Sequence, residues 1–239
     1  METSNYLKKV VYKKPKQQDF PFNLSALNDL NDLVFDQPLT FFVGENGTGK
    51  STVIEMIASL MGMNMEGGSR NQLFSTYEEN YSLADACRPV RYPSYPKDFY
   101  FYRAESFYNL MTEIEETDAF GPSVFERDLH SYSRGESFVE LLTNRFFGKG
   151  FYLLDEPETG LSLSTQLQVM VLLKDLIGAD SQFIIATHSP VLLFFPNAKI
   201  YEFSADSIQE KKLKETRIYQ DWSMIFEREQ YFFEKLLSE

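Results

Sequence analysis

Leu39-Thr-Phe-Phe-Val-Gly-Glu-Asn-Gly-Thr-Gly-Lys-Ser51 joins an apolar run directly to a glycine-rich segment. Residues 39–43 are typical of a strand that is buried on both faces of a sheet. The residues from Gly44 to Ser51 then fit the pattern G-x-x-x-x-G-K-[ST] without deviation. A helix with one apolar side is predicted over 51–61. The pattern therefore lies between a strand and a helix, which is where a phosphate-binding loop is found.

The residue types in this segment suit the binding of a nucleotide. Its glycines allow the backbone to curl so that successive N–H groups point toward an anion, and the helix N-terminus adds to their effect. Lys50 would place a positive charge on the β- and γ-phosphates, and the Ser51 hydroxyl would bind Mg²⁺. The predicted nucleotide-binding residues here are Gly44, Glu45, Asn46, Gly47, Thr48, Gly49, Lys50, Ser51 and Thr52. A glycine-rich turn capped by Ser51 is the structural alternative.

Two adjacent acids end a second apolar run, Phe151-Tyr-Leu-Leu-Asp-Glu-Pro157. Asp155 is expected at the carboxyl end of the sheet, where ligands bind in α/β folds, and would accept Mg²⁺ or its water. The side chain of Glu156 points in another direction, so we predict that it orients and deprotonates the attacking water. A polar turn closed by Pro157 is the structural alternative.

A histidine follows a third apolar run, in Gln182-Phe-Ile-Ile-Ala-Thr-His-Ser-Pro190. If this run is a strand of the same sheet, His188 lies near the γ-phosphate and could sense it by hydrogen bonding. A lone histidine is more often structural, and we interpret the other one, His130, in that way.

Composition narrows the class of protein. The chain has 239 residues, of which 43% are hydrophobic and 15% aromatic, so it has enough apolar volume for a core. Acidic residues outnumber basic ones by 35 to 23, and the net charge of -12 argues against charge-driven nucleic-acid binding, although a local basic patch stays open. Cys87 is the single cysteine. We see neither a membrane segment nor a secretory signal, and we expect a cytoplasmic protein.

Strands alternate with helices along most of the chain, which predicts an α/β core with a mostly parallel sheet. Further strands are expected at 5–13, 98–102, 182–186 and 199–203, and helices at 25–32, 107–116, 136–147, 164–177 and 217–237. The segment 62–97 shows no clear periodicity. The apolar stripe of the last helix, which includes Trp222 and Phe226, is expected to pack on the body of the protein.

The order of these motifs resembles that of ATP-binding cassette (ABC) ATPases. The segment Ser133-Arg-Gly-Glu-Ser137 is similar to the signature of that family and precedes the paired acids, as it does there. The resemblance covers about 34–203. It is closest to short, stand-alone bacterial ATPases that are related to the heads of chromosome-maintenance and DNA-repair ATPases. The segments at 103–107, 135–138 and 186–190 carry that closer likeness.

The resemblance implies a P-loop NTPase core with N-terminal antiparallel strands and a small helical subdomain at about 104–148, all within one domain, 1–239. It also implies that Ser133, Arg134, Gly135 and Glu136 face the ATP of a second copy. ATP would then join two chains head to tail into a homodimer. The segment 158–162 matches the loop that crosses between the two sites in that family.

Two departures from the family pattern affect this interpretation. Tyr132, Arg134 and Glu136 replace the first, third and fifth residues of the usual Leu-Ser-Gly-Gly-Gln signature, and a helix N-cap is the alternative there. The family also places a metal-binding glutamine after the 98–102 strand, and this chain has none. We predict Glu105 as its substitute in the metal site, with a structural salt bridge as the alternative.

Two functions compete at this point. The first is Mg²⁺-dependent ATP hydrolysis, with Lys50, Glu156 and His188 as catalytic residues and with Ser51, Asp155 and Glu105 as metal ligands. The second is a slow ATP switch that controls a protein effector, for example a nuclease in genome defence or repair. A transporter cassette is a weaker third hypothesis.

Overall fold

The described residues form a central seven-stranded sheet, with its strands in the order β3-β5-β6-β7-β2-β8-β9. The computed structural model describes all residues except 1–4, 17–18, 66, 70–82, 106–133 and 237–239. The strands of this sheet are β2 (Leu39–Gly44), β3 (Gly68–Ser69), β5 (Asp98–Arg103), β6 (Gly150–Asp155), β7 (Gln182–Ala186), β8 (Lys199–Phe203) and β9 (Ile208–Glu210). Strands β5, β6, β7, β2 and β8 pair in parallel, whereas β3 and β9 pair antiparallel at the edges. The predicted α/β fold with a mostly parallel sheet is confirmed.

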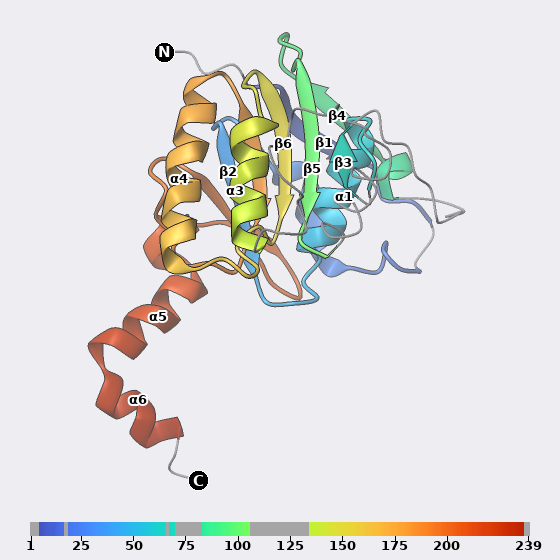
Figure 1. Cartoon of the computed structure of the whole chain (residues 1–239). Coiled ribbons are helices and arrows are strands. Elements are labelled where there is room, and N and C mark those ends of the chain that lie inside the picture. The colour runs from blue at the N-terminus through green and yellow to red at the C-terminus, as the bar shows by residue number, and fades with distance from the viewer. Residues whose placement is uncertain (1–4, 17–18, 66, 70–82, 106–133, 237–239) are drawn as a thin grey trace.

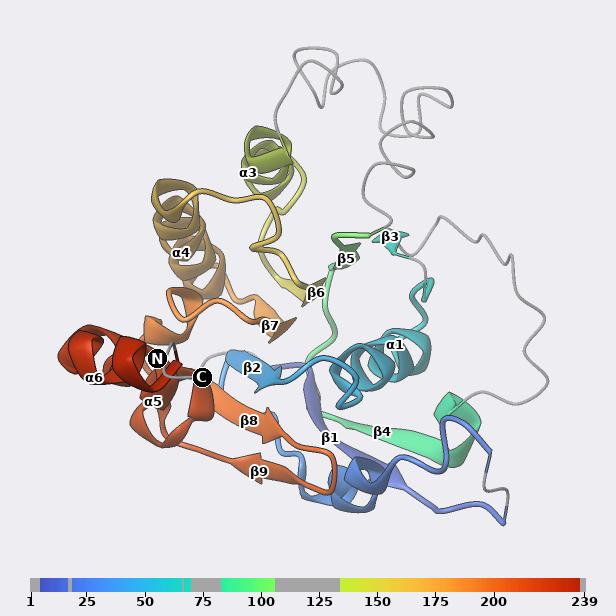
Figure 2. The same cartoon turned by 90° about the horizontal axis from the view of Figure 1, so that it is seen from below.

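The central strands are apolar along their length because both faces of the sheet are covered. Helix α1 (Lys50–Leu60) packs on one face, and α3 (Arg134–Asn144) and α4 (Leu163–Gly178) pack on the other (Figure 2). Successive side chains of β2 point to opposite faces, so Phe42 enters the core beneath α1 and Phe41 enters the core beneath α3 and α4. This arrangement brings the carboxyl ends of β2, β6 and β7 to one edge of the sheet.

A separate two-stranded antiparallel sheet covers the α1 side. It consists of β1 (Leu7–Tyr12) and β4 (Cys87–Arg91), and it confirms the predicted N-terminal antiparallel strands. The buried amide of Gln182 joins it to the large sheet: Oε1 accepts from the backbone N–H groups of Tyr6 and Leu7, each at 2.8 Å, and Nε2 donates to Leu7 O at 3.0 Å. The sequence did not predict β4, because it lies within the segment without periodicity.

Short 3₁₀ helices connect several strands: η1 (Ser25–Asp32), η2 (Leu83–Ala86), η4 (Leu192–Phe194) and η5 (Leu213–Glu215). Helix α3 corresponds to the helix predicted at 136–147. The helix predicted at 107–116 lies outside the described residues. The bounds of the helical subdomain, 104–148, and its place within a single domain therefore stay predictions.

The C-terminal helical region differs from the prediction. It forms two helices, α5 (Arg217–Glu227) and α6 (Glu229–Leu236), because Arg228 is not helical. Figure 1 shows that both extend away from the body of the protein. No residue of α5 is buried, and Trp222 and Phe226 are 42% and 75% exposed. The expected packing of this stripe on the body is wrong, because the helix leaves the body after its first turns.

Among the described residues, no helix combines the length and the apolar character needed to cross a membrane.

Candidate nucleotide-binding site

The glycine-rich loop connects β2 to α1 at the carboxyl edge of the sheet. Gly44 has φ 138°, and a Cβ atom there would lie 2.2 Å from the carbonyl oxygen of Phe203 on β8, so no larger residue fits. Gly49 caps α1 with φ 95°, a left-handed conformation that favours glycine. Glu45 and Asn46 are exposed at the tip of the loop, and the Thr48 hydroxyl donates to Glu45 O at 2.8 Å. The loop thus has the backbone path that an anion-binding loop needs.

Lys50 lies buried beneath the loop. Its Nζ donates to the carbonyl oxygens of Gly44 and Glu45, at 2.9 and 2.8 Å. Burial lowers the pKa of Lys50, and the carboxylates of Glu156, Asp155 and Glu158 oppose that change. The ammonium group therefore lies within the electrostatic influence of three acids, one at the end of β6 and two just after it.

Ser51 and Asp155 meet at the start of α1. The Ser51 hydroxyl donates to Asp155 Oδ1 at 3.2 Å. Burial raises the pKa of Asp155, whereas the hydrogen bond from Ser51 and the charge of Arg103 lower it. Among the described residues, no group of three or more His, Cys, Asp and Glu side chains is arranged to hold a metal. The two oxygens of Ser51 and Asp155 fit Mg²⁺, which commonly takes few protein ligands and completes its octahedron with phosphate oxygens and water.

Glu156 and His188 form a second pair at the same edge. The distance from His188 Nε2 to Glu156 Oε1 is 3.5 Å. Glu156 has φ 51°, a left-handed conformation that is uncommon outside glycine, and its N–H donates to Ala186 O at 3.0 Å. Burial and the charge of Lys50 lower the pKa of His188, while Glu156 opposes them. These effects favour a neutral imidazole beside an acid.

Glu158 begins the segment 158–162 that resembles the loop between the two sites in ABC ATPases, but the sequence assigned this residue no role of its own. Its side chain accepts a hydrogen bond from the backbone N–H of His188. Burial raises the pKa of Glu158, and this hydrogen bond opposes that effect. Glu158 thus fixes the backbone at His188. The available signal was its position just after the paired acids in a turn that contains Pro157.

Two of the predicted signature residues, Gly135 and Glu136, lie apart from the glycine-rich loop. Ser133 is outside the described residues, and α3 begins at Arg134. Gly135 packs near Leu161 and Thr165, and Glu136 lies in the first turn of α3. Because α3 and α1 cover opposite faces of the sheet, the structure does not bring Gly135 and Glu136 into the site of their own chain (Figure 2).

Arg103 and Glu105 occupy the end of β5 beside Asp155. Arg103 forms an ion pair with Glu55 at 2.9 Å and donates to Met65 O at 3.1 Å. Glu105 lies 3.6 Å from Arg103, and its side chain is 88% exposed. This is the salt-bridge arrangement that the sequence left as the alternative to a metal ligand, so the role of Glu105 in metal binding stays a prediction.

A cavity of about 640 Å³, lined by polar and apolar side chains, lies beside the glycine-rich loop. The loop, His188, the turn between β8 and β9, and the start of α5 line it. Arg217 on α5 forms an ion pair with Glu45 at 3.1 Å, which links the C-terminal helices to the loop. This contact could not be predicted from the sequence, because its two partners are 172 positions apart along the chain.

Comparison with protein families gives two matches. A model described as "AAA domain, putative AbiEii toxin, Type IV TA system" matches residues 126–193, and one described as "AAA domain" matches residues 22–90. A "Putative ABC transporter ATP-binding protein" of Methanosarcina mazei is 29% identical over 189 residues. That match covers 74% of this chain and 65% of the relative, so the chain spans less than two thirds of it.

The solved structures that match this chain include a component of an ABC transporter complex and an SmcHead. CbiO1 from Clostridium perfringens, part of an ABC transporter complex, is 14% identical with a TM-score of 0.47 and covers 94% of this chain and 97% of its own. The SmcHead bound to the C-winged helix domain of ScpA is 16% identical with a TM-score of 0.47, covering 76% and 93%. The motifs and their order, with the family models and the archaeal relative, confirm the resemblance: this chain is similar to ABC-type ATPases.

Proposed function

We propose that the chain binds ATP with Mg²⁺ and hydrolyses it, and that bound ATP joins two copies head to tail. The observation that carries this proposal is the meeting of Lys50, the Ser51–Asp155 pair and the Glu156–His188 pair at one edge of the sheet. Phosphoryl transfer requires mainly positioning and electrostatic stabilisation, and these groups supply both.

Each residue has a defined part in this proposal. The loop N–H groups and Lys50 hold the phosphates, and Ser51 and Asp155 would hold Mg²⁺, which neutralises charge on the phosphate oxygens. Glu156 accepts a proton from the attacking water. His188, held by Glu158 through its backbone N–H, donates a hydrogen bond to the γ-phosphate. The strained backbone of Glu156 supports this assignment, because such conformations cluster at functional sites.

The test uses Glu156→Gln, which keeps the shape of the side chain and removes the base. We expect hydrolysis to fall by about 10²–10⁴-fold, as for the loss of a general base, while ATP binding persists. Light scattering of this variant should then show a dimer with ATP and Mg²⁺ and a monomer without them. Glu210→Gln is the matched control. Glu210 on β9 lies beside Lys199, the first residue of β8, and therefore at the amino ends of the parallel strands, away from the glycine-rich loop. Hydrolysis by Glu156→Gln at the rate of the unchanged chain would contradict the proposal.

Head-to-tail dimerisation can be tested separately at α3. In this arrangement Ser133, Arg134, Gly135 and Glu136 complete the site of the second copy. Glu136→Trp, at an exposed position in the first turn of α3, should therefore prevent the ATP-dependent dimer in the Glu156→Gln background while a single chain still binds ATP. A dimer that persists in this double variant would contradict the composite site.

The second candidate is a slow ATP switch that controls a protein effector in the cytoplasm. The ion pair between Arg217 and Glu45 favours it, because it connects the nucleotide loop to a C-terminal helix that stands away from the body. The name of the matching toxin family is compatible with an effector system. A turnover below about one per minute, together with recovery of one defined protein by Glu156→Gln only with ATP, would support the switch. Recovery of a membrane subunit would favour the transporter cassette instead.

A further inference from the structure

An apolar groove of about 650 Å³ lies between α4, η4 and α5. Leu163 and Leu167 of α4 form one wall, Trp222 and Phe226 of α5 form the other wall, and Phe194 of η4 also lines the groove. Glu227 is the single charged residue among those that line it. The described lining of the groove is therefore mostly apolar, with one negatively charged side chain.

The exposed apolar side chains of the described residues concentrate around this groove. Phe226 is 75% exposed, Leu163 61%, Phe194 59% and Leu167 50%. Val171 follows Leu163 and Leu167 at helical spacing on α4 and is also exposed. Contiguous apolar patches of this kind mark interaction sites on proteins.

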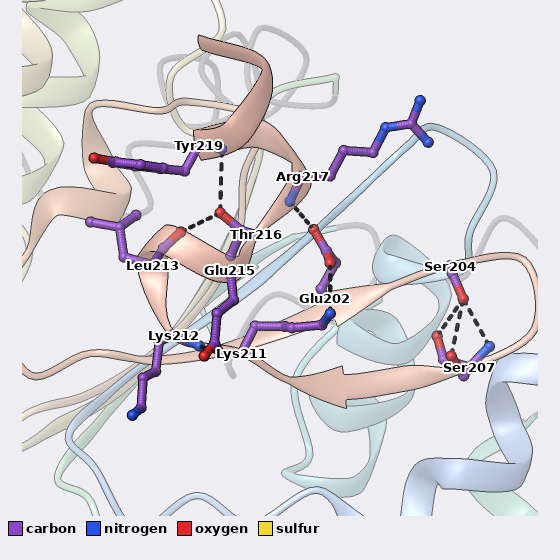
Figure 3. A network of polar contacts seen from close by, with 10 residues as sticks. All are labelled: Glu202, Ser204, Ser207, Lys211, Lys212, Leu213, Glu215, Thr216, Arg217 and Tyr219. Atoms are coloured by element: carbon purple, nitrogen blue, oxygen red, sulfur yellow. Dashed lines mark hydrogen bonds and ion pairs between the residues drawn. The ribbon is translucent and has the colours of Figure 1, made fainter. Parts of the chain in front are cut away.

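The wall formed by α5 is anchored to the body at its N-terminal end. The Thr216 hydroxyl accepts from the N–H of Tyr219 at 3.3 Å and donates to Leu213 O at 2.7 Å. Glu202 of β8 accepts from the N–H of Arg217 at 2.7 Å (Figure 3). The rings of Phe194 and Tyr219 also lie 6.1 Å apart, and this contact within the chain holds the start of α5 against η4. A preformed surface lowers the ordering cost of binding.

We propose that this groove binds the apolar face of a basic amphipathic helix of another protein. Apolar grooves of this kind accept helices through side chains at i, i+3, i+4 and i+7. The carboxylate of Glu227 at the rim and the net charge of -12 of the chain favour a cationic partner. A second copy would instead bring another Glu227 and another net charge of -12 to the same face, with no nucleotide between the two. None of the proposed catalytic or metal-binding residues lines the groove, so this proposal goes beyond ATP hydrolysis and does not depend on it.

Trp222 allows a direct test, because it is the only tryptophan of the chain and it lines the groove. The probe is a synthetic amphipathic helix of leucine and lysine, compared with a leucine and glutamate peptide of the same pattern. The lysine peptide should shift Trp222 emission to shorter wavelength in a saturable manner with one peptide per chain, and the glutamate peptide should not. Leu167→Glu and Phe226→Glu should each weaken the affinity at least tenfold.

The control variant is Phe147→Glu, since Phe147 is 73% exposed in the loop between α3 and β6. It should bind the lysine peptide as the unchanged chain does, and ATP hydrolysis should be equal in all three variants. No saturable shift, equal affinity for both peptides, or an equal loss in Phe147→Glu would overturn the proposal. A nucleotide-free dimer that Leu167→Glu converts to a monomer would also overturn it, by assigning the groove to a second copy.

Discussion

At the scale of single residues, Asp155 shows how burial and hydrogen bonding compete. Burial raises its pKa, while the Ser51 hydroxyl at 3.2 Å and the charge of Arg103 stabilise its ionised form. Burial removes the water that would otherwise stabilise the ionised carboxylate. A divalent cation bound at Asp155 would supply that stabilisation instead.

We expect Asp155→Asn to weaken the apparent affinity for Mg²⁺ by about 10- to 100-fold or more, a range seen even for supporting residues of metal sites. The amide of asparagine has the size of the carboxylate but lacks its negative charge, which is what attracts Mg²⁺. Titration of Mg²⁺ against binding of a fluorescent ATP analogue measures this effect. Asp175→Asn, on the exposed side of α4, should leave the titration unchanged. An unchanged Mg²⁺ curve for Asp155→Asn would exclude Asp155 as a ligand.

The residues of the site differ in how well the sequence predicted their places. Asp155 and His188 each end an apolar run, so their position at the edge of a parallel sheet follows from the strand pattern alone. Arg217 could not be predicted, because its contact with Glu45 depends on how a surface helix leaves the body. Glu105 shows a further limit, since the spacing placed it near Asp155 without fixing whether it faces the metal or Arg103.

At the scale of elements, strand β7 connects the two sheets through Gln182. Its fully buried amide makes three hydrogen bonds of 3.0 Å or less to the backbone at Tyr6 and Leu7. We expect Gln182→Leu to lower the free energy of unfolding by about 3 kcal/mol, because it leaves several buried backbone groups unpaired at about 1–3 kcal/mol each. Urea denaturation measures the change. Gln209→Leu on the exposed side of β9 is the control, and a loss below about 1 kcal/mol in Gln182→Leu would contradict this account.

Elements with a strong local pattern were predicted well, and elements that depend on distant partners were not. The runs that became β2, β6 and β7 are continuously apolar, which indicates strands covered on both faces. Strand β4 contains Pro89 and has no alternation of apolar residues, and only its pairing with β1 makes it a strand. The stripe of α5 correctly indicated a helix with one apolar side, but a stripe does not say which surface covers it.

At the scale of the whole molecule, buried groups that lose a proton at high pH limit stability in alkali. Burial raises the pKa of Cys87 to about 12 and raises the pKa of Tyr100 and Tyr152 above the usual tyrosine value. These groups are neutral in both states below about pH 8. At higher pH the unfolded chain releases their protons first, from about 8.5 for cysteine and about 10 for tyrosine, while the folded chain retains them.

We therefore expect the free energy of unfolding to fall as the pH rises above about 9. Each group that is ionised in the unfolded state alone contributes a slope of about 1.4 kcal/mol per pH unit. Urea midpoints at pH 8, 9 and 10 measure the trend, and Cys87→Ala should reduce the slope between pH 9 and 10. Equal stability at pH 8 and 10 would contradict it.

The left-handed backbone of Glu156 also has a consequence for how this site can change over generations. A glycine at position 156 would relieve about 1–3 kcal/mol of backbone strain. A mutation from glutamate to glycine there would therefore stabilise the fold. That replacement would remove the carboxylate beside His188. A lineage that needs the carboxylate therefore keeps a less stable protein. Under the proposed function, a lineage that lost glutamate here while retaining Lys50 would bind ATP without turning it over.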